Sequence, residues 1–127
     1  MDTKTYTVAH NVTVTITPGD TFTPEDMLTS RHPGAWDRRQ WSYTVTEDGK
    51  TIISGDDITG PVSLTADAAF HTLAAFIGAE AEKYTGSGRM GQATPEDGWY
   101  FGGGYPSEFC YLYADEFACA AMEYEDA

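Results

Sequence analysis

The chain has 127 residues, of which 41% are hydrophobic and 13% aromatic, and its 20 acidic and 7 basic residues give a formal net charge of −13. This length suits one domain with a single core, and the apolar content excludes a chain that is disordered throughout. The charge argues against direct binding to nucleic acid or to an anionic membrane, and it favours a protein partner with a basic surface. The negative charge is concentrated in residues 56–127, with a net −11 against −2 in residues 1–55.

The N-terminal residues, 1–4, lack the basic and apolar regions of a signal peptide. No apolar run in the sequence approaches the roughly 18 residues that a membrane span needs. We therefore expect a cytoplasmic protein. In a reducing compartment, Cys110 and Cys119 are expected to be free, buried thiols.

Residues 5–17 alternate between threonine-rich odd positions and even positions that are mostly apolar, namely Tyr6, Val8, His10, Val12, Val14 and Ile16. A period of two predicts a β-strand with one buried face. His10 and Asn11 offer an alternative, a tight hairpin turn in the middle of the segment. Pro18, Gly19 and Asp20 are expected to end the strand.

A short helix is expected next, because Thr23 is a suitable N-cap and Pro24 suits the first helical position, followed by two acids. The run His32, Pro33 and Gly34 is expected to end that helix.

Two strands follow, at residues 40–47 and 50–54. They are joined by Asp48 and Gly49, a pair typical of a tight β-hairpin turn. Residues 55–57 and 60–61, which contain glycine, aspartate and proline, predict loops.

A long helix is predicted for residues 66–84. Thr65 is its expected N-cap. Apolar residues recur at spacings of three, four and seven and predict a buried helical stripe of Phe70, Leu73, Phe76, Ile77 and Tyr84. Gly86 is expected to stop this helix, and residues 86–106 are predicted to form a glycine-rich loop.

The C-terminal segment has two interpretations. Ser107 could cap a helix, whereas residues 108–113 could equally form a strand, so we expect helix from about Ala114 and leave residues 108–113 open. Residues 114–126 form an acidic C-terminal segment. Together these elements predict a single α+β domain over residues 1–127, in which a small antiparallel sheet packs against one long helix, with a second helical segment at the C-terminus.

The motifs of common enzymes are weak here. Residues 86–91 match G-x-G-x-x-G, but they follow a predicted helix, whereas a dinucleotide site requires a preceding strand. The histidines and cysteines lack the short spacings of a zinc site. Neighbouring acids are more often solvated surface than acid–base pairs, and no serine or cysteine lies in a nucleophile motif. We therefore expect a non-enzymatic protein without a cofactor or a metal.

Residues 96–126 hold nine of the 17 aromatic residues, eight acids and no base. Such a surface can bind a basic partner through aromatic contacts and electrostatic steering. Alternatively, the rings form the core and the acids only keep the protein soluble. The candidate partner-binding residues are Tyr111, Asp115, Glu116, Glu123, Tyr124 and Glu125.

A second candidate surface is the basic, tryptophan-containing segment 31–41, with Arg31, Trp36, Arg38 and Arg39. Arginine and tryptophan are common at the centres of protein interfaces. The alternative is that the arginines pair with acids inside the molecule.

Residues 40–57, with the sequence QWSYTVTEDGKTIISGDD, resemble a stretch found in small acidic accessory proteins of phages that infect actinobacteria. The resemblance implies a phage protein that acts in the host cytoplasm, where small phage proteins often bind and disable host factors. With the negative charge of residues 56–127, it gives the first hypothesis: a protein that binds and inhibits or modulates a host protein through its acidic face, or by imitating the charge of nucleic acid. A homo-oligomeric structural protein is the second hypothesis, and a small enzyme is the third.

Overall fold

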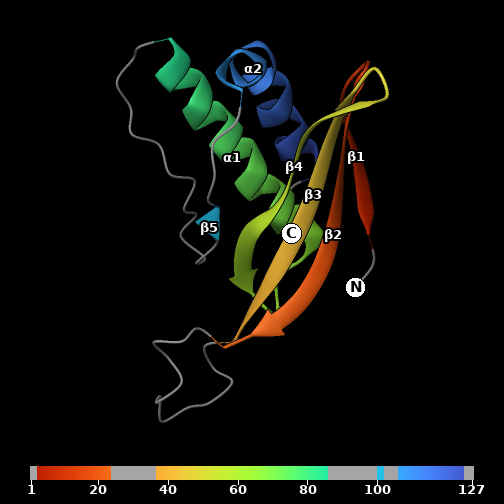
Figure 1. Ribbon diagram of the computed structural model, residues 1–127, viewed down its shortest axis with the longest axis vertical. Coiled ribbons are helices and arrows are strands. Elements are labelled where there is room, and N and C mark those ends of the chain that lie inside the picture. The colour runs from red at the N-terminus through yellow and green to blue at the C-terminus, as the bar shows by residue number, and fades with distance from the viewer. Residues whose placement is uncertain (1–2, 24–36, 86–99, 102–105, 125–127) are drawn as a thin grey trace.

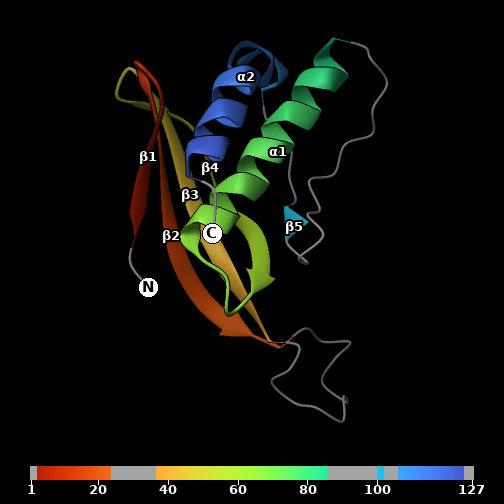
Figure 2. The ribbon, with the colours of Figure 1, turned by 180° about the vertical axis from the view of Figure 1, so that it is seen from behind.

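The structure is a computed structural model that describes residues 3–23, 37–85, 100–101 and 106–124. Along the chain, its elements are β1 (Lys4–Ala9), β2 (Val12–Phe22), β3 (Arg38–Glu47), β4 (Lys50–Pro61), α1 (Ala66–Tyr84), β5 (Tyr100–Phe101) and α2 (Ser107–Glu123). The strands pair antiparallel in chain order, and both helices cover the same face of the sheet (Figures 1 and 2). The predicted α+β fold is confirmed.

The two faces of the sheet follow the alternation of the sequence. Tyr6, Val14, Val45 and Ile53 lie side by side across β1 to β4 and are buried beneath the helices. The next row, on the opposite face, carries only short hydroxyl side chains, namely Thr5, Thr15, Thr44 and Ser54. Since successive side chains of a strand point to opposite faces, the core lies entirely between the sheet and the helices.

The N-terminal segment is a hairpin rather than one strand. The chain reverses at His10 and Asn11, so the alternative that the sequence offered is the one that forms, and His10 is exposed in the turn. Pro18 does not end β2, because a shift of register between Pro18 and Thr21 lets the strand continue to Phe22. A bulge suits proline, which has no amide hydrogen to donate to the ladder.

The second hairpin has the predicted turn, with Asp48 and Gly49 at positive φ angles of 53° and 78°. The prediction that residues 55–57 and 60–61 form loops is wrong, because β4 extends to Pro61. Between the pairs Tyr43–Gly55 and Trp41–Ile58, β4 contains one more residue than β3. A bulge therefore accommodates the glycine and the aspartates within a strand.

Helix α1 has the predicted bounds. The Thr65 hydroxyl accepts a hydrogen bond from the Ala68 amide at 3.3 Å, which satisfies one of the free N–H groups at the helix start. Phe70, Leu73 and Ile77 are fully buried, as their helical spacing predicted. Tyr84, the last residue of the predicted stripe, is instead exposed at the end of α1, which corrects the prediction for that residue. The apolar side of α1 therefore lies in the core between the sheet and α2.

Helix α2 begins earlier than expected. It starts at Ser107, so residues 108–113 are helical, and Pro106 rather than Ser107 occupies the N-cap position. Phe109 and Cys110 are buried in the core, which explains why the helical arrangement is preferred in this segment.

Two predicted segments lie outside the described residues. These are the short helix that was expected after Thr23 and most of the predicted glycine-rich loop 86–106. Within that loop, the structure describes Pro106 and β5, where Tyr100 and Phe101 pair with β4, so the loop prediction is wrong for these two strand residues. No helix in the described part of the chain is long and apolar enough to cross a membrane.

Candidate functional site

The outward side of α2 carries large apolar side chains that contact water. Its inward side packs against the core through Phe109, Cys110, Phe117, Ala120 and Ala121. On the other side, Tyr111, Leu112 and Met122 are 51%, 58% and 75% exposed. Tyr84, at the end of α1, is exposed by 52%, and its ring centroid lies 5.2 Å from that of Tyr111. We call Tyr84, Tyr111, Leu112 and Met122 the apolar patch.

The apolar patch stands out from the rest of the described surface. Only one further large apolar side chain of the described residues is exposed, Phe22 on β2. Exposed apolar side chains that gather in one place often mark an interaction site, and aromatic residues and methionine are enriched in such sites.

Carboxylates are interspersed with the apolar patch. Glu108, Asp115 and Glu123 are exposed on the same helix, and the sequence of α2 contains no lysine, arginine or histidine. The result is a surface that can contribute both apolar contact and negative charge. These are the two properties that a basic protein partner would recognise.

The six acidic and aromatic candidates that the sequence predicted lie in different environments in the structure. Tyr111, Asp115 and Glu123 lie on the outward side of α2. Glu116 is half-buried, and its Oε2 has no hydrogen-bond partner among the described residues. Tyr124 packs inward, edge-on to the ring of Tyr6 with centroids 4.8 Å apart.

Glu125, the sixth candidate, lies outside the described residues. Sequence reasoning missed Tyr84, Leu112 and Met122. Tyr84 was expected in the buried stripe of α1, and Leu112 lies in residues 108–113, which were not assigned to a helix. The signal that could have found them is helical phase: residues 111, 115, 118 and 122 share one side only if the whole segment is helical.

The arginine candidates make contacts within the sheet. Arg38 donates from Nη2 to the Thr59 carbonyl at 3.0 Å, and Arg39 donates from Nη1 to the Gly19 carbonyl at 2.9 Å. Burial lowers the pKa of the Arg38 guanidinium. Each arginine thus links β3 to a neighbouring strand, whereas Arg31 and Trp36 lie outside the described residues.

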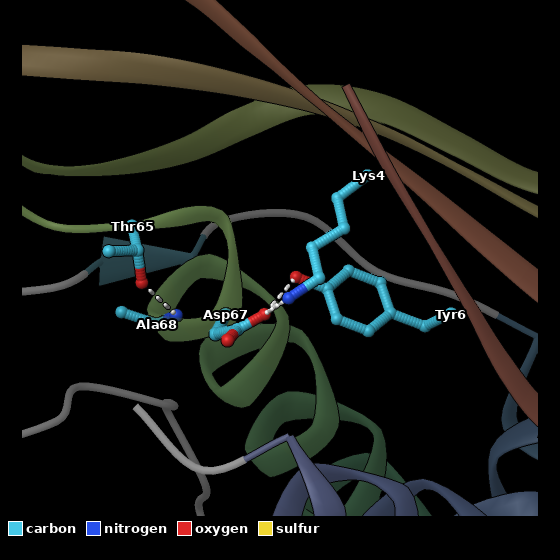
Figure 3. Close-up of polar contacts among 5 residues, drawn as sticks. All are labelled: Lys4, Tyr6, Thr65, Asp67 and Ala68. Carbon is cyan, nitrogen blue, oxygen red and sulfur yellow. Dashed lines mark hydrogen bonds and ion pairs between the residues drawn. The ribbon is translucent and has the colours of Figure 1, made fainter. Parts of the chain in front are cut away.

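A second cluster of polar groups joins β1 to the start of α1 (Figure 3). The Tyr6 hydroxyl donates to Asp67 Oδ1 at 2.7 Å, and Lys4 Nζ forms an ion pair with the same oxygen. Lys4 also lies over the rings of Tyr6 and Tyr124, at 5.3 and 5.6 Å from their centroids. Burial alone would raise the pKa of Asp67, but the hydrogen bonds from Lys4 and Tyr6 outweigh it and lower this pKa.

This cluster is better suited to structure than to catalysis. A lysine, a tyrosine and a carboxylate can act together as acid and base, but Tyr6 is fully buried, so its hydroxyl cannot contact a substrate. The contacts instead fix the edge strand β1 against α1.

A half-buried carboxylate, Asp57, lies in the bulge of β4. The Tyr43 hydroxyl donates to Asp57 Oδ1 at 2.5 Å. Burial raises the pKa of Asp57, its backbone hydrogen bond opposes that change, and the charge of Asp56 adds to it.

The two cysteines differ in environment. Cys110 is fully buried, and its burial, together with the nearby Glu80 carboxylate, raises the pKa of its thiol to about 11. Such a thiol is protonated at neutral pH and is a poor nucleophile. Cys119 is exposed on the outward side of α2, which corrects the expectation that both thiols are buried. The described residues contain no group of three His, Cys, Asp or Glu side chains that could hold a metal ion.

Comparison of the chain with protein-family models, curated protein sequences and solved structures finds no match.

Proposed function

We propose that this protein is a non-enzymatic, phage-encoded binding protein that inhibits or modulates a host protein by binding a basic surface through the outward side of α2. The observation that carries the proposal is the apolar patch, which lies among the exposed carboxylates of a helix without a basic residue. The resemblance of residues 40–57 to phage accessory proteins supports the assignment to a phage.

The two components of this surface have different roles in binding. Large side chains such as Tyr111, Leu112 and Met122 exclude water at the centre of an interface and slow dissociation. Carboxylates at its rim mainly accelerate association with a positively charged partner, and salt screens their effect. The proposal therefore includes a strong dependence of binding on ionic strength.

Literal imitation of nucleic acid fits this surface less well. Glu108 and Asp115 are seven residues apart on α2, which is about 10 Å along a helix axis. Double-stranded DNA carries one charge for about every 1.7 Å of its axis. The carboxylates of α2 are therefore much sparser than phosphates, and a mixed acidic and apolar contact surface is the better description.

The experiment is affinity capture from an actinobacterial lysate at about 50 mM salt, with mass spectrometry of the retained proteins. Three baits are compared: the unaltered protein, the double variant Leu112→Ser/Met122→Ser, and Phe22→Ser as the matched control, because Phe22 is also exposed but lies on β2. We expect the same host protein on the first and third baits, its loss from the second, and its release at about 500 mM salt. Its activity should fall when the unaltered protein is added.

The proposal is wrong if no host protein is retained by the control bait and lost from the double variant. It is also wrong if the activity of the retained host protein does not change when the unaltered phage protein is added. Sedimentation tests the alternative of a homo-oligomer. A concentration-dependent oligomer that the double variant abolishes would assign the apolar patch to self-association.

A further inference from the structure

The outward side of α2 is made of exposed positions that are spaced seven residues apart, with different residue types along each row. Glu108, Asp115 and Met122 are seven apart, as are Tyr111 and Ala118, and Leu112 and Cys119. All seven of these residues are exposed. Positions that recur every seven residues form a straight seam on a helix that pairs with a second helix.

The dimensions of the seam suit one helix of a partner. From Glu108 to Met122 it runs 14 residues, or about 21 Å. Tyr84, which contacts Tyr111 from the neighbouring helix, flanks the seam on one side. A partner helix that lies along α2 would contact the rings of Tyr84 and Tyr111 as well as the apolar side chains of the seam.

The charges on the seam define the partner helix further. Two of its seven positions are acidic, Glu108 at the N-terminal end of the seam and Asp115 between apolar positions. An apposed helix would bring its own side chains against these carboxylates. Apolar residues there would leave the carboxylates desolvated and unpaired, whereas lysine or arginine would satisfy them.

We infer that the element bound by α2 is an amphipathic helix of the partner, with apolar residues facing Leu112 and Met122 and with lysine or arginine facing Glu108 and Asp115. This inference rests on the proposed function and names the kind of surface that α2 recognises. A second copy of the chain is a poor occupant, because two chains of net charge −13 repel each other. A parallel pair of α2 helices would also place Asp115 opposite its own copy.

The test uses three fluorescent synthetic peptides of about three heptads each, and it measures their binding by anisotropy at about 50 mM salt. The first peptide has leucine at the apolar seam positions and lysine at the positions that face the acids. The second has glutamate in place of those lysines. The third has the composition of the first in an order without an apolar stripe. We expect the first to bind at least about tenfold more tightly than either of the others.

Charge reversal makes the test specific to α2. The variant Glu108→Lys/Asp115→Lys should prefer the glutamate peptide over the lysine peptide, which inverts the preference of the unaltered protein. The variant Asp20→Lys/Asp56→Lys changes the net charge equally at two exposed acids of β2 and β4, and it should keep the original preference. Circular dichroism of both variants checks that the helices are intact.

Each outcome decides the inference. Equal binding of the first and third peptides would show that charge alone suffices, and equal binding of the first and second would remove the role of Glu108 and Asp115. Failure of all three peptides to bind, or a charge reversal without effect, would also overturn the helical partner. The capture experiment with Leu112→Ser/Met122→Ser would still decide the proposed function, since it does not depend on the partner's secondary structure.

Discussion

The ring of Tyr6 on β1 stacks on the ring of Phe70 on α1, with centroids 4.2 Å apart and an angle of 5° between the planes. The same tyrosine donates its hydroxyl to Asp67, one turn earlier on α1. One side chain therefore fixes the edge strand to the helix by both a ring contact and a hydrogen bond.

Substitutions at Tyr6 should separate these two contributions. Tyr6→Phe keeps the ring and removes the hydroxyl, so we expect it to lower the free energy of unfolding by about 1 kcal/mol. Tyr6→Ala also removes the stacked ring and leaves a cavity, so we expect a loss of about 3–5 kcal/mol. Urea denaturation measures both values. Similar losses in the two variants would mean that the hydroxyl, and not the ring, carries the stabilisation.

Asp67→Asn should change how stability depends on pH. Because the folded state lowers the pKa of Asp67, it binds fewer protons at this site than the unfolded state does. The resulting stabilisation is fully present above the usual aspartate range of about 4, and it is lost as the pH falls through the lowered pKa. We therefore expect Asp67→Asn to be less stable than the unaltered protein at pH 7, with a difference that shrinks in acid.

Asp57→Asn is the matched variant with the opposite sign. The pKa of Asp57 is raised, so the folded state binds more protons here and loses stability as the pH rises through this pKa. Relative to the unaltered protein, Asp57→Asn should therefore become more stable from acid to neutral pH. Urea titrations at several pH values measure both trends, and parallel trends for the two variants would contradict these assignments.

The fold was largely predictable because local patterns and tertiary packing agree. Thr65 and the apolar spacing after it define α1 to the residue. The loop predicted at Gly55 was wrong because glycine and aspartate disfavour strands locally, whereas pairing with β3 extends β4 through them. In such places, hydrogen bonds between distant residues override local preference.

The candidate site was predictable only in part. Composition located aromatic and acidic residues in the C-terminal region, but it cannot distinguish inward from outward rings. Tyr111 is exposed, whereas Tyr124 packs on Tyr6, and the phase of α2 determines that difference. This phase depends on where the helix begins, and packing of Phe109 and Cys110 against the core favours a start at Ser107.

The two thiols should react very differently with an alkylating reagent. Cys119 is exposed, whereas Cys110 is buried, and at pH 8 a pKa of about 11 leaves about one part in a thousand of the Cys110 thiol ionised. We expect one thiol per folded chain to react rapidly and the second to react only in denaturant. Mass spectrometry counts the added groups, and Cys119→Ser should remove the rapid reaction. Rapid alkylation of both thiols in the folded protein would contradict the burial of Cys110.

Alkylation of Cys119 also gives the most direct test of whether the outward side of α2 is a binding surface. Cys119 lies on the helix seam, so a bound partner should shield it, while a cysteine introduced by Thr15→Cys in a Cys119→Ser background reports on the opposite face of the sheet. The measurement is the alkylation rate of each cysteine with and without a saturating amount of the captured host protein. The proposed surface predicts that Cys119 reacts at least about tenfold more slowly in the complex, with no change at position 15. An unchanged rate at Cys119, together with slowing at position 15, would place the interface on the sheet and contradict the proposal.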